Sequence, residues 1–292
     1  MKILLLLLLS SSFINTAFAV KIGEIEKNYN NLIHNKIALI PHEGTYILPV
    51  SYSEKPNNKP YEALSKSSPE RKDRGDFAQK MEAEFQFSFL VMMAQEAFES
   101  KYDLFIGFTQ RSYWQVYNGD WSRPFRESNY KPEVFVRDHF ENSIDTIFGG
   151  KIKVYDFGYV HQSNGQVQEL SRSWDRIFFR TLMHFDRLFL KLTLWHRVTE
   201  EREEDDNPDL YKYLGYGELD FRYIWEGQSY NLRIIPGVEK QGLELSYSSP
   251  WKEGLRFYTK IGHGYGLSLQ DYDHNHSRIG IGFILSDFLT AQ

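Results

Sequence analysis

Residues 84–93 read EFQFSFLVMM, with a phenylalanine at each odd position from 85 to 89 and a polar side chain at each even position from 84 to 88. A period of two places the two kinds of side chain on opposite faces of a β-strand. Similar alternating runs recur to the end of the chain, and they are longer than the usual globular strand of about 5–6 residues. The pattern predicts an all-β protein built from long strands.

The polar face of these strands carries Arg, Lys, Asp and Glu at mid-strand positions. Charged side chains under an apolar outer band are typical of the lumen of a membrane barrel, and bacterial outer-membrane barrels have an even number of strands. We therefore predict a twelve-stranded antiparallel transmembrane β-barrel of the bacterial outer membrane. A soluble all-β domain is the alternative, because it also alternates. The predicted strands are 42–51, 81–94, 102–117, 131–141, 151–163, 174–184, 187–197, 211–225, 229–237, 240–249, 254–264 and 277–288.

The connections between the predicted strands alternate in length, with long polar loops on one side and short turns on the other, as in outer-membrane barrels. Residues 52–80 form the long first extracellular loop of this prediction, residues 200–206 an acid-rich solvated loop, and the short connection 238–239 breaks the rule. All six tryptophans fall near predicted strand ends or in loops, which predicts that they belong to the aromatic girdles at the membrane interfaces. They are Trp114, Trp121, Trp174, Trp195, Trp225 and Trp251.

The N-terminus has the three parts of a secretory signal peptide: Lys2, the apolar run Ile3–Leu9, and the small-residue site Ala17–Ala19. We predict cleavage after residue 19 and a single barrel domain over 20–292. A membrane anchor is the alternative, but the apolar run is too short to span a bilayer. No later window of the sequence has the roughly 18 apolar residues of a transmembrane helix.

The composition excludes several classes of protein. The 34 basic and 39 acidic residues give a net charge of −5, so no electrostatic footprint for nucleic acid is present. The absence of cysteine excludes disulfides, thiol nucleophiles and cysteine–zinc sites. A mean hydropathy of −0.49 argues against a helical membrane bundle but not against a barrel with a polar lumen.

A hydrogen-bonding residue on the lipid face of a barrel costs free energy, so it requires a partner or a function. The outward register of strand 151–163 runs through Tyr155, Phe157 and Tyr159 to His161 and Ser163. On the neighbouring strand, the outward positions that end at Ile177 continue to Asp175. A carboxylate, an imidazole and a hydroxyl therefore meet on the outside of one hairpin, at the extracellular membrane boundary.

These three groups are the inventory of nucleophilic acyl transfer. Ser163 would attack a carbonyl carbon, His161 would accept the proton, and Asp175 would orient the imidazole. Gly165 lacks a side chain, so its backbone N–H can approach a developing oxyanion. The alternative is that His161 and Ser163 are ordinary rim residues.

Gln110 is a second polar residue at an outward position. A glutamine in the lipid belt indicates a protein contact and hence self-association. The alternative, that Gln110 already lies in the headgroup zone, stays open on register alone.

In identity and spacing, four separated motifs resemble those of the outer membrane phospholipase A family, over residues from about 81 to 288. The motifs are His161-Gln162-Ser163-Asn164-Gly165 with Ser171-Arg172-Ser173-Trp174-Asp175-Arg176; Ser122-Arg123-Pro124-Phe125-Arg126-Glu127-Ser128-Asn129-Tyr130; Asp206-Asn207-Pro208-Asp209 with Lys212-Tyr213 and Gly215-Tyr216; and Gly264-Tyr265-Gly266 with Ser268 and Asp271-Tyr272. The resemblance implies a twelve-stranded barrel that hydrolyses acyl esters of phospholipids and lysophospholipids, requires Ca²⁺ and is active as a homodimer.

By position, the resemblance implies Ser163 as nucleophile and His161 as base, with the oxyanion held by the Gly165 amide and a calcium-bound water. It implies calcium ligation by the Ser171 side chain, by the Gln166 backbone carbonyl and by Ser122 of the second protomer. Hydroxyl, carbonyl and water oxygens suit Ca²⁺.

The resemblance also implies that Asp206 supports a second, weaker calcium site and that Gln110 is a dimer contact. The sequence departs from the family at Asp175, where an asparagine is usual, and at Gln166, where an arginine is usual. A non-catalytic outer-membrane barrel, a pore or an adhesin, is the alternative function.

Overall fold

The computed structural model describes residues 39–62, 74–146, 149–201, 203, 205–252 and 254–286. The predicted signal peptide and residues 63–73 of the predicted first loop lie outside them. The barrel strands are β2 (Thr45–Ser53), β3 (Met81–Ala94), β4 (Tyr102–Trp114), β5 (Phe125–Asp145), β6 (Lys151–Ser163), β7 (Ser173–Phe185), β8 (Leu188–Arg197), β9 (Gly217–Trp225), β10 (Gln228–Pro236), β11 (Gln241–Lys252), β12 (Leu255–Gly264) and β13 (His276–Ser286).

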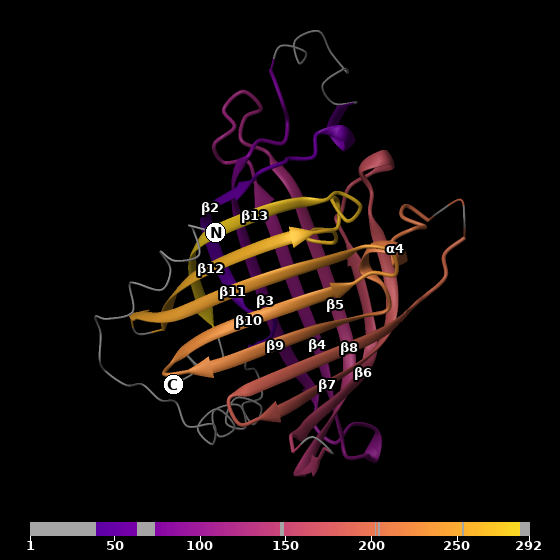
Figure 1. Ribbon diagram of the computed structural model, residues 1–292. Helices are drawn as coiled ribbons and strands as arrows, with labels where there is room; N and C mark the ends of the chain where they lie inside the picture. The colour runs from indigo at the N-terminus through magenta and orange to yellow at the C-terminus, as the bar shows by residue number, and fades with distance from the viewer. Residues whose placement is uncertain are drawn as a thin grey trace.

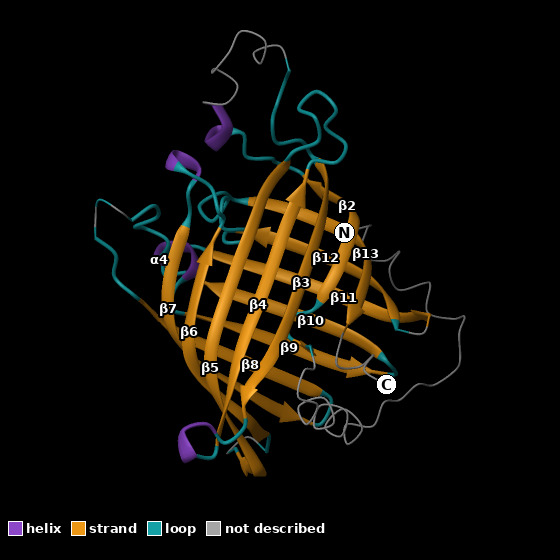
Figure 2. Cartoon of the chain, turned by 180° about the vertical axis from the view of Figure 1, so that it is seen from behind, coloured by secondary structure: helices purple, strands orange, loops and turns teal. Residues whose placement is uncertain are grey.

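Each of these strands pairs antiparallel with the next, and β13 pairs with β2, so the sheet closes on itself (Figures 1 and 2). The two-residue strand β1 (Ile40–Pro41) also pairs with β3, just beyond the β2 pairing. Closure leaves no open sheet edge in the membrane. The predicted twelve-stranded antiparallel barrel is confirmed. Among the described residues, no helix is long and apolar enough to cross a membrane.

Several predicted boundaries differ from the structure by two to four residues, and two differ by six. Strand β5 begins at Phe125 rather than 131, and the predicted strand 211–225 begins as the short helix α4 (Tyr211–Leu214), with β9 following only from Gly217. Gly215 ends the helix with a positive φ of 63°, and a Cβ there would lie 2.1 Å from the Pro236 carbonyl oxygen. Alternation alone does not report such a turn.

The two faces of the barrel are the reverse of those of a soluble protein. Outward side chains such as Phe87 and Phe157 are 49% and 59% exposed, whereas the inward Glu84 and Asp156 are at most 1% exposed. Large exposed apolar surfaces mark contact with lipid or protein, and a band of them around a closed barrel is the lipid-facing surface.

Buried ion pairs occupy much of the lumen. Glu82 accepts hydrogen bonds from Arg126 and Arg278, Glu84 from Arg111 and Lys260, Glu244 from Arg111 and Arg233, and Asp156 from Arg137 and Arg180. A cavity of about 110 Å³ is lined by Arg111, Arg180 and Arg233 of these pairs, together with other polar and apolar residues of the lumen. Pairing compensates the desolvation of charges that the lumen buries.

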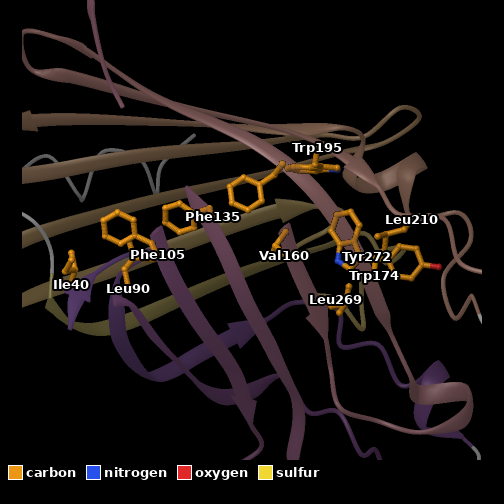
Figure 3. Packing of buried hydrophobic residues seen from close by; sticks show 11 residues of the cluster. Ile40, Leu90, Phe105, Phe135, Val160, Trp174, Trp195, Leu210, Leu269 and Tyr272 are labelled. Carbon is orange, nitrogen blue, oxygen red and sulfur yellow. The ribbon is translucent and has the colours of Figure 1, made fainter. Parts of the chain in front are cut away.

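An apolar cluster also lies inside the barrel and extends from Ile40, Leu90 and Phe105 to Trp174 and Tyr272 (Figure 3). Its members Trp174 and Trp195 are 3% and 9% exposed, so their prediction as girdle residues is wrong. Both occupy inward positions of their strands. Nearness to a strand end does not show whether a side chain points into the barrel or out of it. The prediction is also wrong for Trp121, which packs against Phe77 in a loop cluster.

The loops of the two barrel ends differ in length. The connections 54–80, 115–124, 164–172, 198–216, 237–240 and 265–275 lie at one end, and 95–101, 146–150, 186–187, 226–227 and 253–254 at the other. The first group contains the long connections, together with the short 237–240. The outward polar residues of the β6–β7 hairpin lie at this long-loop end.

Candidate active site

His161 and Asp175 are directly paired across strands β6 and β7. The Nδ1 atom of His161 lies 2.9 Å from Oδ1 of Asp175, and their side chains are 39% and 25% exposed. Both side chains point outward, because their neighbours Val160 and Trp174 are buried. The strand register therefore brings the predicted base and the predicted orienting carboxylate together on the outside of the barrel.

Ser163 lies two residues after His161 on the same face of β6. It is the last residue of the strand and is paired with Ser173 on one side and Tyr130 on the other. The predicted nucleophile, base and carboxylate thus share one outward face at the long-loop end. The structure describes no hydrogen bond between Ser163 and His161, so it brings the two residues onto one face without showing their direct contact.

Tyr159 is a contact that the sequence reasoning missed. Its hydroxyl donates to Oδ1 of Asp175 at 2.5 Å, the same oxygen that faces His161. The signal was present in the sequence, because Tyr159 precedes His161 by two positions on the outward face. A carboxylate at the membrane boundary thus has two hydrogen-bond partners, which offset part of its desolvation.

Gly165 has a positive φ of 62°, a conformation that side chains with a Cβ rarely adopt. A Cβ at this position would also lie 3.2 Å from the Tyr130 ring. The glycine therefore lets the chain turn sharply just after Ser163, with the backbone close to that serine. A backbone N–H in such a turn is free of a side chain that would block the approach of a ligand.

Ser171 and Asp206, which are predicted to belong to two separate calcium sites, lie together. Ser171 Oγ donates to Asp206 Oδ2 at 2.5 Å, although the residues belong to the separate loops 164–172 and 198–216. No cluster of three or more His, Asp or Glu able to hold a metal occurs in the described part of the chain. A hydroxyl and a carboxylate, with the backbone carbonyl of Gln166 in the same loop, form an oxygen donor set that fits Ca²⁺ better than softer metals.

Ser122 lies in the separate loop 115–124. It is exposed and has a φ of 58°, and its amide donates to the Gly119 carbonyl at 3.1 Å. Within a single chain, Ser122 contacts neither Ser171 nor Gln166 in any hydrogen bond described by the structure.

Gln110 is partly buried and lies on the outward face of β4. Its Nε2 atom donates to Ser112 Oγ at 3.2 Å, and Ser112 Oγ lies 2.8 Å from Ser128 Oγ on β5. A polar strip therefore crosses two strands among lipid-facing residues. A polar strip in this position suits contact with another protein surface.

The acid-rich loop after β8 is tied to the barrel end rather than fully solvated. Arg197 donates to Asp205 at 2.6 Å and to Glu200 at 3.5 Å. Burial raises the pKa of Glu200. The negative charges of Asp205 and Asp175 also raise this pKa, whereas the positive charge of Arg197 lowers it. The loop adds negative potential beside the candidate site, which favours a cation there.

Comparisons with known proteins agree with this geometry. The family model described as phospholipase A1 matches residues 23–285. The phospholipase A1 of Klebsiella pneumoniae is 34% identical over 272 residues, which cover 91% of this chain and 88% of the relative.

Two solved structures are similar along most of their length. The outer membrane phospholipase A from Escherichia coli has a TM-score of 0.76 and 29% identity, and covers 85% of this chain and 98% of its own. The Salmonella typhi outer membrane phospholipase dimer with bound calcium has a TM-score of 0.78 and 28% identity, and covers 89% and 97%.

Proposed function

The chain belongs to the phospholipase A1 family, and from this premise we propose that it hydrolyses acyl ester bonds of phospholipids and lysophospholipids in the outer membrane. The observation that carries the proposal is the His161–Asp175 hydrogen bond on the outward face, two residues from Ser163. A site on the lipid face can receive a lipid laterally from the membrane, with its headgroup at the loops.

In the acylation step, Ser163 Oγ attacks the ester carbonyl carbon while His161 takes the hydroxyl proton. Asp175 accepts a hydrogen bond from Nδ1–H of His161 at 2.9 Å. This bond leaves the other ring nitrogen as the base and stabilises the imidazolium. The imidazolium then protonates the leaving alkoxide, and the acyl chain stays on Ser163. A phospholipid thereby gives a lysophospholipid, and a lysophospholipid gives a glycerophosphodiester.

In the deacylation step, His161 removes a proton from water, which attacks the acyl-serine carbonyl carbon. The bond to Ser163 Oγ then breaks, the imidazolium returns its proton to that oxygen, and a fatty acid is released. The Gly165 N–H stabilises the negative charge on the oxygen of each tetrahedral intermediate. The same groups therefore serve both half-reactions. The chemistry does not distinguish the two glycerol positions, so the proposal includes both A1 and A2 activity.

Calcium would be held by Ser171, by the Gln166 carbonyl and by Ser122 of a second protomer, with Asp206 beside them. When bound, it would polarise the ester carbonyl and stabilise oxyanion charge as a Lewis acid. The short Ser171–Asp206 contact supports an oxygen-rich site at this position. A ligand from the second protomer would make the monomer's site incomplete, so dimerisation through the surface around Gln110 would activate the protein.

We propose further that residues 1–19 direct export and are removed. The cleavage site is tested by N-terminal sequencing of protein purified from outer membranes. An N-terminus at residue 20 is expected, and retention of Met1 would contradict cleavage.

The decisive experiment measures fatty-acid release from mixed micelles of phospholipid and detergent. Wild-type protein should release fatty acid with calcium and lose that activity with a chelator, and Ser163→Ala should be inactive under both conditions. Equal release from the variant and the wild type would overturn the enzyme proposal. Release that persists in chelator would overturn the calcium requirement alone.

The ion pairs of the lumen favour the enzyme over a passive pore. The described lumen contains buried, paired charges and a cavity of only about 110 Å³. Planar-bilayer recording should show no steady conductance. Steady open-channel currents, with no fatty-acid release, would instead support the pore.

A further inference from the structure

The loop 265–275 between β12 and β13 folds into the mouth of the barrel instead of extending from it. Its residues Leu267, Leu269 and Gln270 are 1%, 3% and 2% exposed. The Tyr113 hydroxyl on β4 donates to the Leu267 carbonyl at 3.1 Å. This loop therefore forms a packed surface on the inner side of the strands that carry the candidate site.

Gln270 lies at the centre of that packed surface and joins two distant parts of the chain. Its backbone N–H donates to Oε1 of Glu127 on β5 at 2.6 Å. Its side-chain Oε1 accepts a hydrogen bond from Nδ2 of Asn164 at 2.9 Å. Asn164 is the residue that directly follows Ser163.

Asn164 is 2% exposed and uses both ends of its amide within the loop 164–172. Oδ1 accepts hydrogen bonds from the backbone N–H of Gln166 at 3.2 Å and from the backbone N–H of Arg172 at 3.0 Å. Nδ2 donates to the Leu170 carbonyl at 2.7 Å as well as to Gln270. One buried side chain therefore fixes both ends of the loop.

That loop carries groups that the proposed function uses. Gly165 lies between Asn164 and Gln166 and has a positive φ, so the turn that Asn164 closes sets the direction of the Gly165 N–H. The hydrogen bond from the Gln166 backbone N–H to Asn164 Oδ1 fixes the peptide unit that joins Gly165 to Gln166, and that unit lies between the Gly165 N–H and the Gln166 carbonyl. A small rotation of Asn164 would therefore move both groups.

We propose that Gln270 is a positioning residue, which acts through Asn164 to hold the Gly165 amide and the Gln166 carbonyl in place beside Ser163. The inference rests on the proposed function for its catalytic consequence, but not for its structural one. The inserted loop 265–275 then supports catalysis from the lumenal side, while substrate approaches from the lipid side.

The structural consequence is tested by hydrogen–deuterium exchange of the detergent-solubilised full chain in chelator. Gln270→Met keeps the size of the side chain but removes its oxygen, so Asn164 Nδ2 loses a partner in a buried position. We expect the peptide that spans 164–172 to exchange roughly fivefold to tenfold faster, as for the loss of one buried hydrogen bond. Asp273→Asn is the matched control, because Asp273 is exposed on the same loop and makes no described hydrogen bond to Asn164, Gln270 or Glu127.

The catalytic consequence is tested by kinetics with calcium. Gln270→Met should lower kcat by roughly fivefold to tenfold with little change in KM. Asp273→Asn should retain wild-type values. Unchanged exchange of 164–172 in Gln270→Met would overturn the proposed contact. Faster exchange with unchanged kcat would show a purely structural role and overturn the positioning.

Two further results keep the test decisive. If Gln270→Met does not fold, wild-type exchange in rising denaturant answers the question, because the peptides 164–172 and 265–275 should lose protection together. Independent opening of the two peptides would overturn the inference. An inactive wild-type protein with the expected exchange pattern would contradict the proposed function and leave the Asn164–Gln270 coupling intact.

Discussion

Oδ1 of Asp175 faces two groups at once, the Nδ1 atom of His161 at 2.9 Å and the Tyr159 hydroxyl at 2.5 Å. His161 and Asp175 are direct partners in the β6–β7 ladder, so the relative position of the two side chains is set by strand register. Sites built on paired strands are held more rigidly than sites built on loops. The orienting function of Asp175 should therefore depend mainly on one acceptor oxygen.

Asp175→Asn should retain at least about a tenth of the wild-type kcat, because an amide oxygen can accept the same bond from Nδ1–H of His161. Asp175→Ala removes the acceptor and should lose roughly a hundredfold or more. Fatty-acid release from mixed micelles measures both variants. A loss near 10⁴ in Asp175→Asn with an intact fold, as in serine proteases where asparagine selects the wrong tautomer, would refute this orienting role.

Tyr159→Phe should have different effects in the two backgrounds. Either oxygen of the Asp175 carboxylate can accept the bond from His161, so loss of the Tyr159 hydroxyl alone should reduce kcat by only about fivefold. In Asp175→Asn, the same hydroxyl keeps the amide oxygen, rather than the NH₂ group, toward His161. The double variant should therefore lose more activity than the two single variants predict together.

The coupling is measured with a double-mutant cycle on kcat. Strict additivity of the two changes would show that Tyr159 does not select the orientation of the side chain at 175. Phe157→Leu, a change on the same outward face without a hydroxyl group, is the control and should leave kcat near the wild-type value.

The fold could be predicted from the sequence because strand parity is a local property. Alternation over residues such as 84–93 indicates both the strand and its outward face. A sheet with an apolar outer face in a membrane must close, because an open edge would leave backbone polar groups without partners. The same alternation predicted that Ser163, His161 and Asp175 share one outward face. In the structure, His161 and Asp175 are in contact.

Features that depend on distant parts of the chain could not be predicted in this way. Trp174 lies near a strand end, but its inward position places it against Trp195 inside the barrel. The contact between Asn164 and Gln270 joins loops 106 residues apart in the sequence. Periodicity in the sequence does not predict which loop folds into the lumen, because the inward fold of a loop depends on its packing around Tyr113 and Glu127.

The ion pairs of the lumen should contribute strongly to stability. Glu82 is 2% exposed and accepts hydrogen bonds from Arg126, Arg278 and Gln115. Glu82→Gln removes the carboxylate that two buried guanidinium groups share, although Arg126 keeps Asp271 and Arg278 keeps Glu84 as ion-pair partners. The substitution should lower the free energy of unfolding by about 1–3 kcal/mol. Urea titration of the detergent-solubilised protein provides the measurement.

The matched control for this change is Glu239→Gln. Glu239 is a 54% exposed carboxylate that lies 3.7 Å from Lys212. Exposed pairs contribute little, so this variant should stay within about 0.5 kcal/mol of the wild type. Equal effects of the two substitutions would show that the buried network does not determine the stability of the barrel.

The calcium requirement should depend on the Ser171–Asp206 pair. The Ser171 hydroxyl donates a hydrogen bond to Asp206, so the lone pairs of its Oγ atom are available to a cation. Ser171→Ala removes that oxygen, and Asp206→Asn removes the carboxylate charge beside it. Each change should raise the calcium concentration for half-maximal fatty-acid release by roughly tenfold or more, the equivalent of one charge-assisted contact.

Glu239→Gln removes one negative charge at the same end of the barrel without contact to Ser171, and should leave the calcium dependence unchanged. If all three variants required the same calcium concentration as the wild type, the activating cation would lie elsewhere, and Ser171 and Asp206 would form a structural contact between the loops 164–172 and 198–216.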